Sequence, residues 1–463
     1  MKKFFLFSLL VIVMASGCRK IEVDGDTTNN GGGGTTDNFI LSGKINADKT
    51  LKSGSTYKLR GIVYVVDGAT LTIEPGTRIE GEKSSRGALI ITRGSKLMAD
   101  GTKDKPIIFT SDASTPTAGD WGGIVLLGRA RTNASYNGVA GVGEIEGGVN
   151  NAEGLGLYGG ADDADNSGIL RYVRIEYGGY AFLPDKELNS LTMGGVGSGT
   201  ILDYIQVSYA LDDAYEWFGG AVNAKHLIAY KSLDDDFDTD NGYRGKVQFG
   251  IVFRDSSRAD ISSVEAFESD NDPNGSTLTP QTAAVFSNIT AIGPRADITN
   301  TGSNLFKAGA QIRRNSSISI FNSLIMGWPI GILIDASRGT ATDLNIKTNT
   351  LNVQNTIISG SAKALDYAAS TTPTGWTRDS VTTWFNTASF GNNIYPNNSD
   401  VKLTAAFNYS SPDFSPLAGS PALTGAGFTN TKLSGLTPVT FRGAVGPAGT
   451  PEGDWWKGWT VFN

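Results

Sequence analysis

The chain has only one cysteine and one histidine among its 463 residues. A single cysteine excludes a disulfide framework within the chain and any zinc or iron–sulfur centre built from several thiolates. A single histidine excludes a His-rich metal centre and any mechanism that uses two imidazoles. Basic residues are also fewer than acidic ones, with 39 Lys and Arg and 46 Asp and Glu. The resulting net charge of −7 argues against general nucleic-acid binding, which needs a basic surface.

Long hydrophobic runs are missing as well. No segment after the N-terminus approaches the ~18 consecutive apolar residues of a membrane-spanning helix. What the chain has instead is 59 glycines and 39% hydrophobic residues, which suffice for a large core and exclude a disordered chain. The glycines follow no Gly-X-Y period, so collagen is excluded too.

Residues 1–17 have the features of a secretory signal peptide. Lys2 and Lys3 precede an apolar segment, residues 4–14, that is too short to span a membrane. Ala15-Ser16-Gly17 then precedes Cys18, a pattern that resembles a bacterial lipobox with Ala15 in place of the more common Leu. The resemblance implies cleavage before Cys18 and lipidation of Cys18. An ordinary signal peptide with an incidental cysteine is the alternative.

Residues 18–38 predict a flexible tether, because they include the glycines at 31–34 and have no apolar periodicity. Glu22, Asp24 and Asp26 follow the cysteine closely, which resembles the acidic signal that sends Bacteroidetes-type lipoproteins to the cell surface. The resemblance implies an outer-membrane protein, anchored by its N-terminal lipid, with its body at the cell surface. A merely soluble linker is the alternative.

Residues 39–425 predict a stack of short β-strands. Alternating apolar runs recur between Gly, Asn or Asp turns, and helical periodicity is almost absent. The runs 170–177 and 202–209 share the pattern Leu-x-Tyr-[Val/Ile]-x-[Ile/Val]-x-Tyr at an offset of 202 − 170 = 32 residues. Repeats of this length, built from strands alone, indicate a β-helix in which stacked coils close a shared core. A β-sandwich or a propeller is the alternative.

Three later runs each begin with an asparagine, at Asn288, Asn322 and Asn355. If these runs are in register, the three side chains form an interior ladder whose amides hydrogen-bond from coil to coil. The alternative places them in surface turns.

Segments 70–77, 94–111 and 119–124 resemble the opening coils of a family of secreted right-handed parallel β-helix proteins, common on the surface of Bacteroidetes. Segments 216–220 and 234–240 fit the same family. The resemblance implies an all-β, right-handed parallel β-helix with irregular insertions. It implies no reaction, because the molecular activity of the family is mostly unassigned.

Residues 426–463 are expected to form a C-terminal cap. Trp455, Trp456 and Trp459 would pack against the body there, and an exposed aromatic platform for sugars is the alternative.

The densest acidic feature has five aspartates in seven residues, at 234–236, 238 and 240. These carboxylates repel one another unless a cation or a basic partner lies among them. On an extended segment Asp234, Asp236, Asp238 and Asp240 would face one side, and oxygen-only ligands favour Ca²⁺. A solvated turn is the alternative.

A second calcium candidate comprises Asp270, Asp272 and Asn274. Their spacing matches the first half of an EF-hand loop, but Gln281 stands where the loop needs Glu. A solvated turn is again the alternative.

Asp212 and Asp213 form a further acidic group with Glu216. If a coil has about 22 residues, Asp212 and Asp213 lie one coil from Asp234 and Asp235, and the four line one acidic face. Paired carboxylates hydrolyse glycosides when one of them stays protonated. The Gly-His-Gly and Arg-Ile-Lys elements of polygalacturonases are nevertheless absent.

The other chemistry known on β-helices is polyuronide β-elimination, in which Ca²⁺ on aspartates acidifies the uronate and Lys or Arg removes the proton. Arg244 and Lys246 follow the acidic segment and are the candidates for this base. The alternative is that they only neutralise the aspartates. His226 lies in an apolar run and is expected to be a partly buried, satisfied imidazole.

We therefore expect a lipid-anchored cell-surface protein that acts as a binding or structural module for a glycan, a peptide or a neighbouring outer-membrane uptake complex. A non-enzymatic role is favoured because no complete catalytic set is present. A Ca²⁺-dependent polysaccharide lyase or glycoside hydrolase is one alternative, and an adhesin or surface coat is another.

Overall fold

A computed structural model describes residues 39–183, 186–297 and 302–463. The signal peptide, Cys18 and the tether lie outside these residues, so the expectations for them stay predictions. Phe39–Asn463 form a single unit. Within the described ranges, no helix is both long and apolar enough to cross a membrane.

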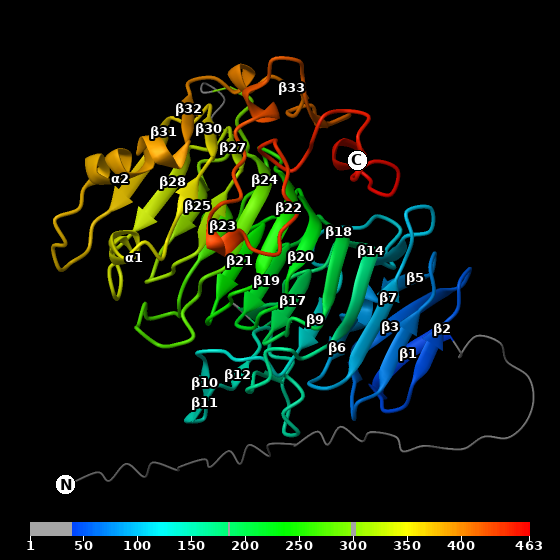
Figure 1. Ribbon diagram of the computed structural model, residues 1–463. Helices are drawn as coiled ribbons and strands as arrows, with labels where there is room; N and C mark the ends of the chain where they lie inside the picture. Colours follow the sequence, from blue (N-terminus) through cyan, green and yellow to red (C-terminus); the bar gives the residue numbers. More distant parts are fainter. Residues whose placement is uncertain (1–38, 184–185, 298–301) are drawn as a thin grey trace, which may run out of the picture. The chain divides into compact units, whose positions relative to one another are not determined.

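Parallel strands wind into successive coils and pair with the coils before and after them (Figure 1). The predicted all-β parallel β-helix is therefore confirmed. The strand pairs arrange themselves on three sides, which we call sides 1, 2 and 3. Side 1 contains β2 (Lys49–Leu51), β4 (Thr70–Ile73), β7 (Lys96–Asp100), β26 (Ser319–Phe321) and β29 (Val353–Gln354). Side 2 contains β5 (Arg78–Gly81), β8 (Ile107–Ser111), β27 (Leu324–Met326), β30 (Ile357–Ser359) and β32 (Asn393–Tyr395).

Five long strands belong to sides 1 and 2 together, because each bends in its middle. They are β14 (Gly168–Glu176), β18 (Ile201–Ser208), β20 (Ala224–Tyr230), β22 (Lys246–Phe253) and β24 (Val285–Ile292). Side 3 contains β6 (Ala88–Ile91), β9 (Gly123–Leu127), β17 (Leu191–Gly194), β19 (Tyr215–Phe218), β21 (Phe237–Asp240), β23 (Val264–Ser269), β25 (Phe306–Ile312), β28 (Ile330–Asp335) and β31 (Lys363–Ala368). The first coils use β1 (Ile40–Ile45) and β3 (Thr56–Val65) on sides 2 and 3.

Insertions and short helices decorate this frame. Two-stranded antiparallel pairs are formed by β10 (Ser135–Tyr136) with β11 (Val139–Ala140), β12 (Gly143–Glu144) with β13 (Leu157–Tyr158), β15 (Ala181–Leu183) with β16 (Lys186–Glu187), and β33 (Leu403–Ala405) with β34 (Asp413–Pro416). The helices are α1 (Asp343–Lys347), α2 (Arg378–Phe385) and α3 (Pro451–Asp454).

The core lies inside the coils, as the alternation in the strands requires. In β4 the two threonines are half-exposed, whereas Leu71 and Ile73 are buried. Because parallel coils stack in register, equal positions form columns of like residues through the solenoid. One continuous apolar cluster extends from Leu41 in the first coil to Phe385 in α2.

The bend between sides 1 and 2 is made by residues in the left-handed backbone region. Tyr172, Tyr204, His226 and Phe249 occupy this position in four successive coils, with φ of 47°, 54°, 52° and 63°. Their rings stack, at centroid distances of 4.4 Å, 4.2 Å and 5.2 Å. A left-handed turn at the same point of each coil thus places aromatic side chains in one column.

Asn288, Asn322 and Asn355 continue this column in the next three coils, with φ of 58°, 52° and 53°. The predicted register is confirmed, but the amides do not bond to one another. Asn288 donates to the carbonyl of Phe441, and Asn322 exchanges hydrogen bonds with Gly427. The ladder is therefore on the outside of the coil, under the C-terminal segment.

Residues 426–463 form a strap along sides 1 and 2, and the three tryptophans pack against the body as expected. Trp459 packs edge-on against Tyr172, with centroids 5.7 Å apart, and Trp455 lies 4.9 Å from His226. Trp455, Trp456 and Trp459 are 6%, 6% and 2% exposed, so they are not a surface platform for sugars. The strap follows the column of bends because the aromatic rings offer it an apolar groove.

Candidate functional site

Carboxylates stack on the outer face of side 3. The register of β19, β21 and β23 places Glu216 beside Asp238 and Asp238 beside Glu268. Strands of a sheet lie about 4.8 Å apart, so the three side chains form a column at that spacing. The column begins after Thr192 in β17 and ends at Gln311 in β25.

A second acidic column lies at the corner that leads into side 3. The side-chain oxygen of Asn189 accepts the backbone N–H of Asp213 at 3.2 Å, and Asp213 accepts that of Asp235 at 2.8 Å. Asp235 in turn accepts the N–H of Glu265 at 2.6 Å. Glu265 ends the series fully buried, and neither of its carboxylate oxygens has a hydrogen-bond partner. Its nearest cation is the Lys307 ammonium, at 3.8 Å.

The two columns form the walls of a cleft of about 220 Å³ that contains one basic side chain, Arg313. The Arg313 guanidinium contacts Glu268, and its Nε donates to Asp270 at 2.9 Å. Nine carboxylates line the cleft: Glu146, Glu187, Asp212, Asp213, Glu216, Asp234, Asp235, Asp238 and Glu268. The balance of charge inside the cleft is therefore strongly negative.

The electrostatic result is a set of carboxyls that resist ionisation. Burial, and then repulsion between neighbours, raises the pKa of Asp213, Asp235 and Asp238 well above the usual range. Burial raises the pKa of Asp234 to about 6. The pKa of Glu268 rises to about 8 through burial, although the Arg313 guanidinium opposes the rise. Carboxylates this close together repel one another unless some of them are protonated or a cation lies between them.

Three groups of carboxylates bring one oxygen each within 4.8 Å of one another. They are Asp213, Glu216 and Asp238; Asp235, Glu265 and Glu268; and Asp212, Asp213 and Asp234. Several carboxylate oxygens of these residues are buried without a hydrogen-bond partner, namely one on Asp234, one on Asp238 and both on Glu265. Oxygen-only sets of this kind suit Ca²⁺ or another hard divalent cation.

The family model for the pectate-lyase-like β-helix domain matches residues 43–402. The chain belongs to this family. No curated protein matches the chain closely enough to add an activity. The expected resemblance to parallel β-helix proteins is thus confirmed, and the Bacteroidetes surface assignment stays a prediction.

In this pectate-lyase-like β-helix, the predicted spacing of the acidic groups is met. Asp213 and Asp235 are stacked one coil apart, as 235 − 213 = 22 residues implied, and Asp212 lies near Asp234. Glu216 joins them through its register with Asp238.

Of the four alternate aspartates expected on one side, Asp234 and Asp238 line the cleft, and the placement of Asp236 beside them is wrong. Asp236 points into the solenoid, where it pairs with Arg254 at 2.9 Å, and both side chains are fully buried. Asp240 is in β21 but in none of the three close carboxylate groups of the described residues. The alternation fails at Asp236 because the chain turns a corner before β21 begins at Phe237, whereas Asp234 and Asp238 both line the cleft.

The carboxylates of Asp270 and Asp272, in the second calcium candidate with Asn274, are engaged by protein groups. Asp270 is engaged by Arg313 and Arg314, at 2.9 Å and 2.7 Å. The oxygens of Asp272 accept the backbone N–H groups of Asn274 and Ser276, at 2.9 Å and 3.0 Å. The turn therefore satisfies its carboxylates with protein groups, and because Asp270 and Asp272 are buried it is not the solvated turn of the alternative either.

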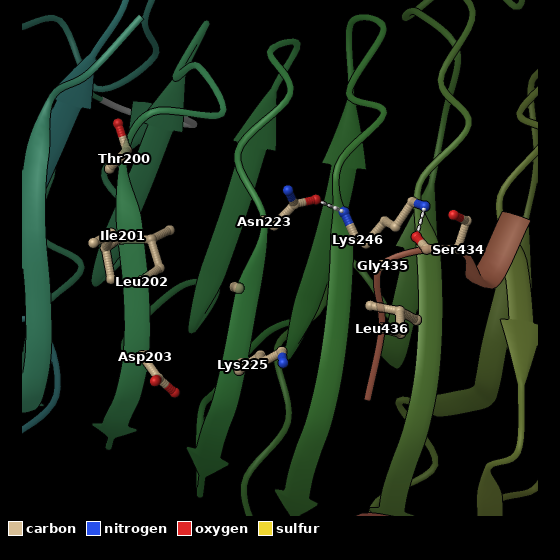
Figure 2. Close-up of a pocket in the computed structure, with 11 residues that line it drawn as sticks. Thr200, Ile201, Leu202, Asp203, Asn223, Lys225, Lys246, Ser434, Gly435 and Leu436 are labelled. Atoms are coloured by element: carbon tan, nitrogen blue, oxygen red, sulfur yellow. Dashed lines mark hydrogen bonds between the residues drawn. The ribbon is translucent and has the colours of Figure 1, made fainter. Parts of the chain in front are cut away.

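Neither candidate base lies in the cleft. Arg244 contacts Asp163, which also contacts Arg131, and these guanidinium groups hold the pKa of Asp163 well below its usual range. Lys246 points across side 1 and donates to the carbonyl of Ser434 in the strap (Figure 2). They therefore do not neutralise the cleft either.

The basic residue that lines the cleft is Arg313, and not Arg244 or Lys246. Its sequence neighbourhood, an Arg-Arg pair, indicates only a surface turn. The register of β23 with β25 brings it beside Glu268, and no local pattern signals that contact. His226 is half-buried as expected, with Nδ1 2.7 Å from Oδ1 of Asp203.

Proposed function

We propose that the cleft binds divalent cations, with Ca²⁺ the first candidate, and that the protein is a cation-dependent binding module for acidic polysaccharides. The observation that carries this proposal is the meeting of nine carboxylates around one guanidinium, with buried oxygens of Asp234 and Asp238 left without hydrogen-bond donors. Buried anions without partners are costly, and a cation that coordinates them removes that cost.

The ligand class follows from coordination. Ca²⁺ takes six to eight oxygens, and each of the two close groups made only of cleft residues supplies three carboxylates. Open positions remain for carboxylate and hydroxyl oxygens of a uronic-acid chain. Without the cation, the same cleft would repel that chain. The pectate-lyase-like family is consistent with a polysaccharide ligand.

Calorimetric titration of residues 39–463 with CaCl₂ tests the cation site. We expect saturable binding that weakens at least about tenfold in Asp238→Asn and in Glu268→Gln. Asp104→Asn, which changes an exposed carboxylate in a turn, is the matched control and should bind as the parent does. No heat of binding for Ca²⁺, Mn²⁺ or Mg²⁺ would refute the proposal.

Retention on immobilised polygalacturonate tests the glycan. We expect retention in Ca²⁺ that is lost with chelator and in Asp238→Asn. Ca²⁺ binding without retention would support the cation site but refute polyuronide as its ligand. An adhesin or surface-coat role would then be the next hypothesis.

A polysaccharide lyase or hydrolase is the second candidate, and Arg313 is the observation that favours it. A guanidinium stands among carboxyls of different acidity, with a pKa of about 6 for Asp234 and about 8 for Glu268. Carboxyls separated in this way serve as acid and base. Ultraviolet absorbance of unsaturated products, followed together with reducing ends, would detect either reaction. Any product formed equally well by Arg313→Met would remove Arg313 as a catalytic residue.

We further propose that lipid on Cys18 holds the protein in the outer membrane. The support is the sequence alone. Metabolic labelling with a fatty acid should mark the parent and spare Cys18→Ser, and protease treatment of intact cells should remove the body if it faces outward. Unlabelled parent protein would refute the anchor.

A further inference from the structure

We propose a second carbohydrate site, for a neutral sugar, beside β31 and α2. The chain has eight tryptophans. Six of them are buried, namely Trp121, Trp217, Trp328, Trp455, Trp456 and Trp459. The remaining two, Trp376 and Trp384, are half-buried and line the same hollow of about 590 Å³. That volume is within the range of small-molecule sites, about 300–1,000 Å³.

Both indoles are held in place before any ligand arrives. The ammonium of Lys347 lies 5.6 Å from the ring centre of Trp376, and it is fixed there by Asp343 at 3.1 Å. Trp384 meets the ring of Phe390 edge-on, with centroids 6.5 Å apart. The two indoles also pack against the core of the solenoid. Aromatic side chains ordered in this way bind with little loss of conformational freedom.

Polar groups surround the two rings. Asp379, Thr383 and Thr387 follow one another at intervals of four residues, along α2 and just beyond it, and so lie on one face. Ser380 also lines the hollow, but its hydroxyl is engaged by Thr377 in the cap of α2. The hollow therefore offers flat apolar surfaces beside a carboxylate and two threonine hydroxyls.

This combination fits a pyranose ring. The C–H face of a sugar packs on an indole, and its hydroxyls donate to a carboxylate and exchange hydrogen bonds with threonine. A uronic acid fits less well, because Asp379 is exposed and would repel its carboxylate, whereas Lys347 is already paired with Asp343. The geometry thus favours a neutral hexose or pentose chain.

The site is independent of the acidic cleft. Different strands and side chains form it, and none of the carboxylates grouped for a cation lies in its lining. Sugar binding here should therefore persist in chelator, which distinguishes it from the cation-dependent binding proposed above.

Calorimetric titration of residues 39–463 in EDTA, with cellohexaose, xylohexaose and mannohexaose as probes, tests the proposal. We expect saturable binding of at least one probe, weakened about tenfold or more by Trp376→Ala and by Trp384→Ala. Asp379→Asn changes only an exposed side chain and should weaken binding by several-fold with an unchanged melting temperature. Glu268→Gln in the cleft and Tyr136→Ala, a half-exposed aromatic in β10, are controls that should bind normally.

Two results would overturn the proposal. One is the absence of saturable binding of all three probes. The other is binding that Trp376→Ala, Trp384→Ala and Asp379→Asn leave unchanged.

Discussion

The Asp213 carboxylate accepts a hydrogen bond from the backbone N–H of Asp235, one coil further along the solenoid, at 2.8 Å. Asp235 repeats the contact with Glu265 in the next coil. A side chain thus replaces a backbone carbonyl as acceptor at the corner. The contact serves the fold, whereas the remaining oxygens of the same side chains face the cleft and serve its charge.

Asp213→Asn should separate these two roles. The amide keeps an oxygen for the Asp235 N–H but removes a carboxyl whose ionisation is opposed by burial and by its neighbours, so we expect a higher melting temperature in chelator and weaker Ca²⁺ binding. Asp213→Ala removes the acceptor and should destabilise by about 1–3 kcal/mol, the cost of a buried donor without a partner. Differential scanning calorimetry with and without Ca²⁺ measures both. A lower melting temperature for Asp213→Asn in chelator would contradict this account.

Stability without Ca²⁺ should fall as the pH rises from about 4 to about 8. The folded pKa values are about 6 for Asp234, about 7 for Glu265 and about 8 for Glu268, all above the value of about 4 in the unfolded chain. Over this window the folded state binds more protons than the unfolded state, so its stability decreases with pH. Groups with a lowered pKa, such as Asp163, act below pH 4 and do not offset the trend.

Denaturant unfolding at several pH values checks this prediction. Saturating Ca²⁺ should flatten the profile, because the cation replaces the protons, and at 100 times its dissociation constant it should add about 2.7 kcal/mol. Glu268→Gln should flatten the profile in chelator. A stability that rises between pH 5 and pH 8 in chelator would be incompatible with repelling carboxylates.

Arg313→Gln should make the protein depend on Ca²⁺ for its stability. The change leaves Glu268 and Asp270 without their shared cation, and we expect a loss of about 1–3 kcal/mol in chelator, discounted from a fully buried pair because Arg313 is 21% exposed. Arg314→Gln is the matched control. Arg314 contacts Asp270 but not Glu268, so this change should lower the free energy of unfolding by less. Equal losses that Ca²⁺ does not restore would contradict a role in the cleft.

His226→Asn should be tolerated better than His226→Val. Position 226 has φ of 52°, and the same bend is occupied by asparagine in three later coils. Asparagine adopts the left-handed region readily, whereas a β-branched residue is strained there by about 1–2 kcal/mol. Urea unfolding of the two variants measures the difference. Equal stabilities would show that stacking on Tyr204 and Phe249, and not the backbone, sets the residue at this bend.

The coil spacing could be predicted from sequence, and the completed cleft could not. The 22-residue offset correctly relates Asp213 to Asp235, because no insertion interrupts that coil. The next coil is longer, and only the register of β21 with β23 brings Glu268 beside Asp238. Arg313 is more distant still. Pairing across several coils decides its position, and no local pattern encodes that pairing.

Asp236 shows where the alternation of inward and outward side chains stops being a guide. The period of two holds within β21 but not across the corner before it, and so Asp236 lies inside with Arg254. The asparagine column was correctly placed in register. Its partners were not foreseeable, because they belong to a strap whose course depends on the packing of Trp455 and Trp459.

The strap should determine the order in which the coils unfold under mechanical force. Its contacts extend from Asn393 in β32 back to Tyr172 in β14, so it ties several coils together. Coils of a solenoid otherwise hold only their neighbours. Force applied at Phe39 should unfold the early coils one at a time. Unfolding should then pause at β14, because β14 can unfold only after the strap has separated from the stacked rings that begin at Tyr172.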